Sequence, residues 1–146
     1  MANECKKTMN LPKTAFPMRA GLAKSEPVRL KGWQDNHVYE QLMKKNEGHD
    51  KFVLHDGPPY ANGPIHLGHA MNKISKDIIN RYRSMQGYQT PYVPGWDCHG
   101  QPIEHKVEEM LGTEKFNQTP VDKIRELCNK FAVENIDLQR EGFKRL

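Results

Sequence analysis

Two short motifs contain most of the side chains in this sequence that could carry out chemistry. The first runs from His55 to His69 and has the sequence HDGPPYANGPIHLGH. The second runs from Pro94 to Gly100 and has the sequence PGWDCHG. Histidines and an aspartate beside turns rich in glycine and proline suit a site where a nucleotide approaches the backbone closely and negative charge develops. The two motifs therefore predict half of a nucleotide site.

His66 and His69 are three residues apart at the start of a predicted helix, so they share one face of it. The backbone N–H groups of a first helical turn have no partner within the helix, and the helix dipole is positive there. We therefore expect a phosphate group at this helix start, with the imidazoles stabilising negative charge on a phosphoryl group. Gly68 removes a side chain between them, which would let a base or a ribose lie on the backbone.

The same residues also have simpler interpretations. Two histidines at helical spacing are often a surface pair or a structural pair, and Asp97 could be an ordinary turn residue. If Asp97 binds a ligand instead, its carboxylate beside the preceding indole suits a protonated amine. A metal site formed by His66, His69, Cys98 and His99 is a further alternative, although the sequence lacks the glutamate of an HEXXH motif and a second cysteine pair.

The elements that must position these motifs form a predicted β-α-β unit. Residues 51–56 and residues 89–96 are short β-favouring runs, each followed by a tight loop. Between them, residues 67–85 repeat apolar side chains every three or four positions, which predicts a helix. A right-handed crossover makes the two strands parallel, so both loops meet in one crevice at the edge of the sheet. The apolar stripe of the helix comprises Leu67, Met71, Ile74, Ile78, Tyr82 and Met85, and the basic residues away from it are Lys73, Lys76, Arg81 and Arg83.

The residues before this unit predict two elements. Residues 1–31 hold several prolines among polar side chains, which favours an extended arm in which the Phe16–Met18 patch could dock on something larger. Residues 30–45 predict a short amphipathic helix that stops at Asn46 and Gly48.

Two further helices are predicted after the unit. The first covers residues 101–112, and a loop follows it to Thr119. The last helix begins with Thr119 as N-cap and Pro120 at its first position. It reaches the end of the sequence without a stop signal, as expected of a chain cut from a longer protein. The side chains expected to face inward are Ile103, Val107, Met110 and Leu111 in the first helix and Ile124, Leu127, Cys128, Phe131 and Leu138 in the last.

Composition limits the classes of protein that need to be considered. The chain has 146 residues, 27% of them charged, and a formal net charge of +4, so it forms at most one domain and shows only a weak preference for anionic ligands. Its three cysteines lack C-x-x-C spacing and cannot all pair within the chain, which favours a reducing cytoplasmic location. The mean hydropathy is −0.84, and neither a membrane span nor a signal peptide is expected.

The order and spelling of the two motifs resemble the catalytic amino-terminal half of a class I aminoacyl-tRNA synthetase. His66-Leu-Gly-His69 is similar to the HIGH signature of that family, with leucine at the variable position. The spellings Pro58-Pro-Tyr-Ala-Asn-Gly63 and Gly95-Trp-Asp-Cys-His-Gly100 are most similar to those of its isoleucine-specific members. Residues 10–19 are also similar to the amino terminus of bacterial isoleucine-specific members.

The resemblance implies an α/β fold. Residues 32–146 would form the amino-terminal part of the catalytic domain, a partial Rossmann-like nucleotide-binding fold in which a β-α-β half is flanked by helices and truncated at its carboxyl end. Residues 1–31 would form the extended arm before it.

The resemblance also implies roles for residues at matching positions. His66 and His69 would contact the phosphates of ATP and stabilise the transition state of adenylate formation. The remaining ATP-binding residues would be Gly68 and Asn62. The residues that bind isoleucine would be Pro58 and Gly57 in the first motif, and Trp96 and Asp97 in the second, with Asp97 on the α-ammonium group. Gln101 stands where leucine is expected after Cys-His-Gly, with an effect that the sequence does not predict.

The implied reaction is ATP-dependent activation of isoleucine to its adenylate, followed by transfer to tRNA(Ile), with Mg²⁺ accompanying ATP and no metal site in the chain itself. The second family signature, a Lys-Met-Ser-Lys-Ser loop, is absent from these residues, as are the editing and anticodon-reading domains. We therefore expect feeble activity from the chain alone, and a missing carboxyl portion is a possible partner. The alternatives are a non-catalytic ATP-binding module, one part of a split enzyme, and a metal-dependent hydrolase.

Overall fold

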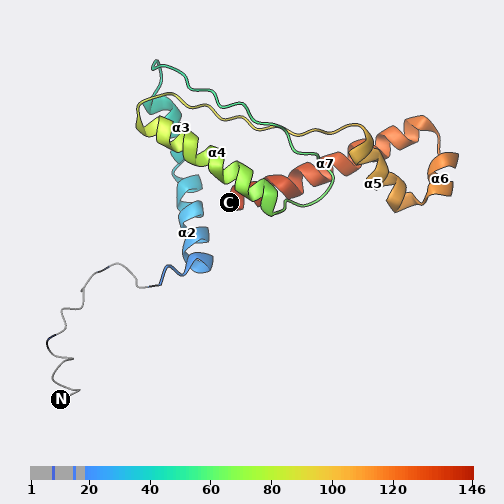
Figure 1. Ribbon diagram of the computed structural model, residues 1–146, viewed down its shortest axis with the longest axis horizontal. Coiled ribbons are helices and arrows are strands. Elements are labelled where there is room, and N and C mark those ends of the chain that lie inside the picture. Colours follow the sequence, from blue (N-terminus) through green and yellow to red (C-terminus); the bar gives the residue numbers. More distant parts are fainter. Residues whose placement is uncertain (1–7, 9–14, 16–18) are drawn as a thin grey trace. The chain divides into compact units, whose positions relative to one another are not determined.

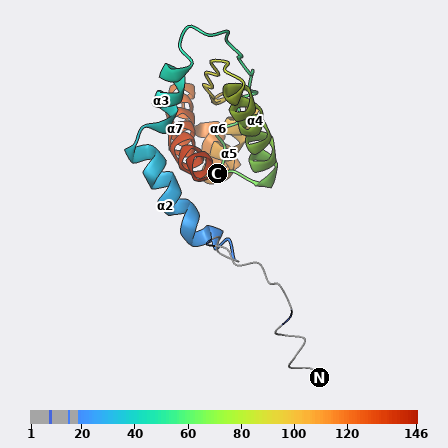
Figure 2. The ribbon, with the colours of Figure 1, turned by 90° about the vertical axis from the view of Figure 1, so that its left-hand side faces the viewer.

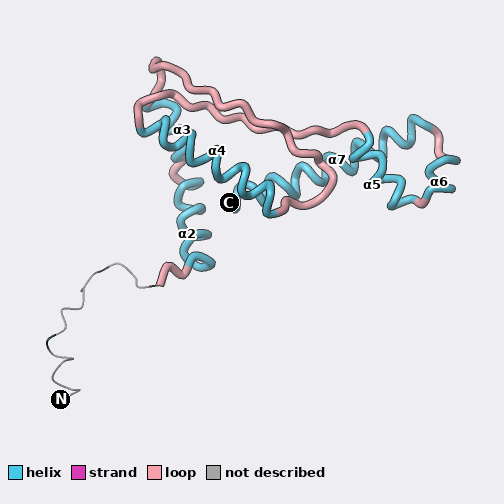
Figure 3. Tube along the Cα trace, in the orientation of Figure 1, coloured by secondary structure: helices cyan, strands magenta, loops and turns pink. Residues whose placement is uncertain are grey.

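The computed structural model describes residues 8, 15 and 19–146, and this part of the chain is mostly helical (Figures 1 and 3). It divides into two units, residues 1–35 and residues 36–146. The Phe16–Met18 patch lies outside the described residues. The helices are α2 (Leu22–Asp35), α3 (Val38–Lys45), α4 (Leu67–Met85), α5 (Gln101–Leu111), α6 (Thr113–Gln118) and α7 (Val121–Arg145).

The described part of the first unit contains α2, so the extended arm predicted for residues 1–31 is wrong over residues 22–31. The helix begins where the carbonyl of Gly21 accepts hydrogen bonds from the backbone N–H groups of Lys24 and Ser25, at 2.9 and 3.0 Å. The single helix predicted over residues 30–45 is also wrong. His37 has a left-handed backbone with φ of 50°, which separates α2 from α3.

The second unit begins with α3, which ends at Asn46 as the sequence predicts. The Asn46 side chain is buried, and its Nδ2 donates hydrogen bonds to the carbonyls of Ser84 and Tyr88 at 3.2 and 2.8 Å. These bonds join the end of α3 to the end of α4.

Two extended segments, residues 51–61 and residues 89–97, run beside each other in the second unit (Figure 1). They meet at two isolated parallel bridges, Lys51 with Gln89 and Tyr60 with Asp97, so the predicted parallel direction is confirmed. The predicted strands themselves do not form, because the described residues contain no ladder beyond these bridges. The reason is the loss of backbone N–H donors, since four prolines lie between the bridges: Pro58, Pro59, Pro91 and Pro94.

The helices after the first motif follow the prediction in most respects. α4 has the expected bounds, and α5 ends at Leu111, one residue before its predicted end. α5 packs against both α6 and α7 (Figure 2). α6 occupies residues expected to form a loop. The hydroxyl of Thr119 donates to the carbonyl of Lys115 at 2.6 Å, so it closes α6 and does not cap α7, whose N-cap is Pro120.

A small apolar core lies where α5 and α7 meet the extended segments. Ala61, Ile103 and Ala132 form its buried centre, and the half-buried Trp96 packs against it. Ile103 and Val107 face inward as predicted, whereas Met110, predicted to do so, is exposed. Of the apolar stripe predicted for α7, Cys128 and Phe131 pack against this core, whereas Leu127 and Leu138 are exposed. The most buried side chains of α7 are Ala132, Asn135 and Gln139.

The apolar stripe of α4 faces solvent. Exposure of its members ranges from 42% at Ile74 to 86% at Leu67, and Ile78 is 61% exposed. None of the described segments covers this face of the helix. The predicted helix is therefore confirmed, whereas its expected apolar inner face is the outer face in this chain.

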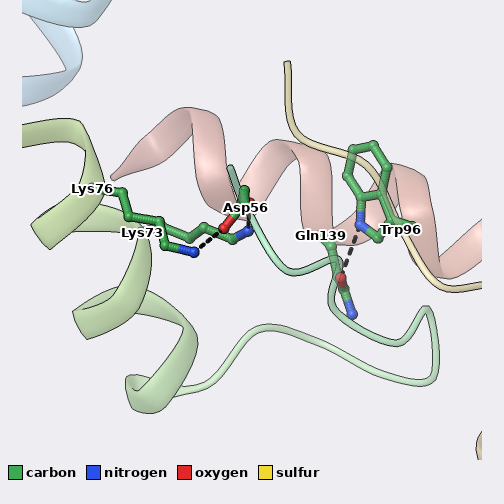
Figure 4. A network of polar contacts seen from close by, with 5 residues as sticks. All are labelled: Asp56, Lys73, Lys76, Trp96 and Gln139. Atoms are coloured by element: carbon green, nitrogen blue, oxygen red, sulfur yellow. Dashed lines mark hydrogen bonds and ion pairs between the residues drawn. The ribbon is translucent and has the colours of Figure 1, made fainter. Parts of the chain in front are cut away.

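The basic face of α4 packs inward instead, against the carboxylate of Asp56 (Figure 4). The ammonium groups of Lys73 and Lys76 each pair with one oxygen of that carboxylate. The Asp56 side chain is 4% exposed, and the two lysine side chains are 13% and 21% exposed. This ion-pair cluster fixes the end of the first extended segment to α4, immediately before the loop that starts at Gly57.

The pKa values in this cluster follow from burial and charge. Burial opposes ionisation of Asp56, but the hydrogen bonds and positive charges of Lys73 and Lys76 outweigh it and hold the pKa below its ordinary value of 3.8. Burial and the negative charge of Asp56 raise the pKa of the neighbouring Tyr92 to about 12. The carboxylate is therefore ionised and the phenol neutral at neutral pH.

The exposed face of α4 predicts self-association of the isolated chain. We expect Ile78→Lys to weaken that association by at least about tenfold, because it places a charge in a contact driven by apolar burial. Sedimentation velocity over a concentration series measures the effect. Asn72→Lys adds the same charge at an exposed position away from the stripe and should change the association little. Equal effects of the two variants would contradict the assignment of the stripe as the associating face.

The ion-pair cluster predicts a stability that depends on pH. The lowered pKa of Asp56 makes its contribution fully present above the ordinary value of 3.8 and lost as the pH falls through the lower folded value. We expect Asp56→Asn to reduce the free energy of unfolding by about 3 kcal/mol at neutral pH and to remove this acid-dependent loss. Urea unfolding at a series of pH values measures both.

Asp77→Asn is the matched control on α4. Asp77 pairs with Arg81 at 2.6 Å, and both side chains are about half exposed. Its loss should cost no more than about 0.5 kcal/mol. Asp56→Asn with the same cost and the same acid dependence as this control would show that the cluster does not hold the segment.

Candidate nucleotide and amino-acid site

The two histidines of the first motif form a capping box at the start of α4. His66 is the N-cap, and its Nδ1 accepts hydrogen bonds from the backbone N–H groups of Gly68 at 3.1 Å and His69 at 3.4 Å. In return, Nδ1 of His69 accepts from the backbone N–H of His66 at 3.3 Å. The two rings stack, with centroids 3.8 Å apart. The pair therefore lies on one face as predicted. However, the His66 ring accepts hydrogen bonds from two of the backbone N–H groups that were expected to bind phosphate.

The cap determines which nitrogen of each ring carries hydrogen. Because Nδ1 is an acceptor in both rings, a neutral His66 and a neutral His69 each carry their hydrogen on Nε2. Burial, and then the charges of His66 and Lys73, lower the pKa of His69, which favours its neutral form. The box therefore provides two neutral Nε2–H donors, which can hydrogen-bond to the oxygens of a phosphate group.

Gly68 is constrained by the same cap. A Cβ atom at this position would lie 3.0 Å from Cε1 and 3.1 Å from Nδ1 of the His66 ring. A side chain at position 68 would therefore push the ring away from the N–H groups that it caps. The sequence predicts that a ligand lies against the backbone at Gly68, but in this structure the His66 ring lies there.

The second motif meets the first through backbone hydrogen bonds. The N–H of Ala61 donates to the carbonyl of Asp97 at 3.0 Å, and the N–H of Asp97 donates to the carbonyl of Pro59 at 2.8 Å. The Asp97 carboxylate accepts from the backbone N–H of His99 at 3.4 Å. The two predicted loops are thus brought together, and Asp97 also makes the turn contact of its simpler interpretation.

A side chain that the sequence analysis missed, Gln139 on α7, joins Trp96 to the first loop (Figure 4). The indole N–H of Trp96 donates to Oε1 of Gln139 at 3.0 Å. Nε2 of Gln139 donates to the carbonyls of Tyr60 and Gly63, at 2.9 and 2.7 Å. A lone glutamine on a helix belongs to no motif, so the sequence carries no signal that could have identified it.

The remaining candidates line the surface of the two loops. Gly57 and Pro58 are exposed, and Asn62 is half-buried. In the sequence, all three lie between Asp56 and the capping box. A Cβ atom at Gly57 would meet open space, so a ligand can approach the backbone there. Gln101 is the exposed first residue of α5.

The metal alternative required His66, His69, Cys98 and His99 to gather at one point. Within the part of the chain that the structure describes, no three His, Cys, Asp or Glu side chains are grouped so that they could hold a metal ion. Cys98 and Cys128 are both free thiols.

Among the described helices, none combines the length and apolar content needed to cross a membrane.

Comparison with known proteins adds independent evidence. A family model described as tRNA synthetases class I (I, L, M and V) matches residues 28–146. Proteins named isoleucine–tRNA ligase from Caldicellulosiruptor saccharolyticus and Lacticaseibacillus casei are 57% and 58% identical over 95% and 97% of the chain. One from Azoarcus sp. is 55% identical over 97% of it.

The chain spans about 15% of the length of each of these relatives. The resemblance stated from the two motifs is confirmed, and it now extends over nearly every residue between them and around them. The chain belongs to the class I tRNA synthetases.

Proposed function

We propose that this chain supplies the ATP-binding and isoleucine-binding part of an isoleucine–tRNA ligase, which activates isoleucine and transfers it to tRNA(Ile). The observation that carries the proposal is the stacked His66–His69 capping box, whose two Nε2–H groups are suited to phosphate oxygens. The names of the relatives support isoleucine as the amino acid.

In the proposed reaction, a carboxylate oxygen of isoleucine attacks the α-phosphorus of ATP. The bond from that phosphorus to the bridging oxygen breaks, and pyrophosphate leaves with the electron pair. The products are isoleucyl-adenylate and pyrophosphate. A hydroxyl at the 3′ end of the tRNA then attacks the carbonyl carbon of the adenylate, the bond from that carbon to the phosphate oxygen breaks, and AMP leaves. Negative charge grows on the phosphate oxygens, where hydrogen bonds from His66 and His69 stabilise the transition state more than the ground state.

The other site residues bind and orient the reactants. We assign Asp97 to the α-ammonium group of isoleucine, and Gly57, Pro58 and Trp96 to the walls of the amino-acid pocket. Asn62 and Gly68 are assigned to ATP. The exposure of Gly57 and Pro58 and the pairing of Asp97 with the first loop support this arrangement. Holding the two reactants in line supplies a large part of the rate enhancement.

We assign Mg²⁺ to the phosphates of ATP, where it supplies positive charge. The free thiols Cys98 and Cys128 support a reducing, cytoplasmic location.

We infer that the two extended segments and α4 belong to a β-α-β half of a Rossmann-like sheet, with further strands supplied by a longer chain. The parallel direction of both bridges supports this fold. The exposed apolar face of α4 supports the alternative in which this chain is one part of a split enzyme, or an ATP-binding module without its own chemistry.

Isoleucine-dependent exchange of pyrophosphate into ATP tests the proposal. We expect slow exchange by the purified chain, and a loss of about 100-fold in the double variant His66→Asn, His69→Gln. Asparagine at the N-cap and glutamine three residues later can rebuild a capping box, so the variant removes the imidazoles while keeping the helix start.

His105→Ala is the matched control, because His105 is an exposed histidine on α5. It should leave the exchange unchanged. Equal exchange by the parent and the double variant would assign the activity to a contaminating host enzyme and overturn the proposal for these histidines. A folded parent that binds ATP without exchange would favour the binding module.

A further inference from the structure

Gln139 is almost completely buried, with 1% of its surface exposed, in a chain whose apolar core is small. Its carboxamide makes three hydrogen bonds to groups from two other segments, at distances of 2.7 to 3.0 Å. An indole N–H can only donate and a carbonyl oxygen can only accept, so these partners determine the orientation of the amide. Every contact is to a residue of, or beside, the candidate amino-acid pocket.

The chemistry of these contacts requires glutamine. A glutamate would keep the acceptor for the Trp96 indole but would place a carboxylate oxygen against the carbonyls of Tyr60 and Gly63. A methionine of similar length would leave the indole and both carbonyls without a partner, which is costly for buried polar groups. An asparagine is one methylene shorter.

The same face of α7 touches the capping box one turn later. A Cβ atom at Gly142 would lie 2.8 Å from Cδ1 of Ile65, so the helix approaches the residue before His66 closely. The ring of Phe143 packs edge-on against His69, with centroids 6.2 Å apart. Positions 139, 142 and 143 follow helical spacing, so one face of α7 contacts the second half of the first motif at several points between Tyr60 and His69.

We propose that Gln139 is a positioning residue for isoleucine activation: its carboxamide holds the Tyr60–Gly63 loop to the Trp96 side chain and, together with the backbone hydrogen bonds of Asp97, fixes the separation of the two pocket motifs. This inference rests on the proposed function. Gln139 itself does not touch the reactants. It acts through Trp96 on one side and through the loop after Gly57 and Pro58 on the other.

This role predicts an effect on isoleucine that is larger than the effect on ATP. Both pocket walls depend on Gln139, whereas the capping box at His66 and His69 is held by its own hydrogen bonds. Releasing the loop should therefore raise the KM for isoleucine about tenfold, and the KM for ATP no more than about threefold, because Asn62 is the one ATP-binding residue that the loop carries.

The test uses the full chain carrying Trp33→Phe, which leaves Trp96 as its one tryptophan. The variants are Gln139→Met and Gln139→Glu, each with circular dichroism as a folding check. NMR measures the rate of hydrogen exchange at the Trp96 indole, and pyrophosphate exchange gives the KM for isoleucine and for ATP. Asn129→Asp, the same amide-to-acid change at an exposed position of α7, is the control.

We expect the indole hydrogen to exchange at least about tenfold faster in Gln139→Met, and to stay protected in Gln139→Glu, which keeps the acceptor. Both variants should raise the KM for isoleucine selectively, and the control should change neither quantity. An unchanged indole rate in Gln139→Met, or equal rises in both KM values, overturns the positioning role while exchange by the parent still upholds the proposed function. If the parent chain shows no exchange of pyrophosphate, both the proposed function and this role of Gln139 are overturned. The exchange rate of the indole hydrogen then tests only whether Gln139 holds Trp96 through a hydrogen bond.

Discussion

The two segments that carry the site are joined through the backbone only near their two ends. They run parallel and meet at two bridges, but the prolines between those bridges remove the N–H donors that a sheet ladder needs. Side chains from helices therefore set the geometry. The Asp56 carboxylate fixes the first segment to α4, and the Gln139 carboxamide fixes both segments to α7. The proline content also explains why the predicted strands were wrong although their direction was right.

α4 shows what hydrophobic periodicity can and cannot predict about a helix. The pattern predicts the helix and its bounds correctly, because apolar repeats at three and four residues depend only on helix geometry. It cannot identify which face the rest of the chain will cover. Asp56 draws the Lys73 and Lys76 face inward, while the stripe that includes Ile78 stays exposed. The chain spans about 15% of the length of the relatives it matches, and the described residues leave this stripe uncovered.

The sequence proposes site residues where they belong to a motif, and it misses residues that matter only through their contacts in the fold. His66, His69 and Asp97 stand in runs whose spelling indicates a nucleotide and an amine. Gln139 stands in an ordinary polar helix, and only the fold reveals that it is buried. α7 was expected to bury an apolar stripe that includes Leu138, yet its buried positions carry small or amide side chains. Amides are selected there because the groups they meet are an indole and backbone carbonyls, which need hydrogen bonds when buried.

The capping box changes how this helix start can bind phosphate. The sequence predicts contact with free backbone N–H groups, but Nδ1 of His66 already accepts from two of them. In the proposed site, phosphate is therefore bound by the Nε2–H groups, on the side of each ring opposite Nδ1. Protonation of His66 or His69 at Nδ1 would add positive charge near a phosphate, but it would also remove the acceptor that holds the cap. The lowered pKa of His69 keeps that acceptor at neutral pH, so the box favours well-placed neutral donors over charge.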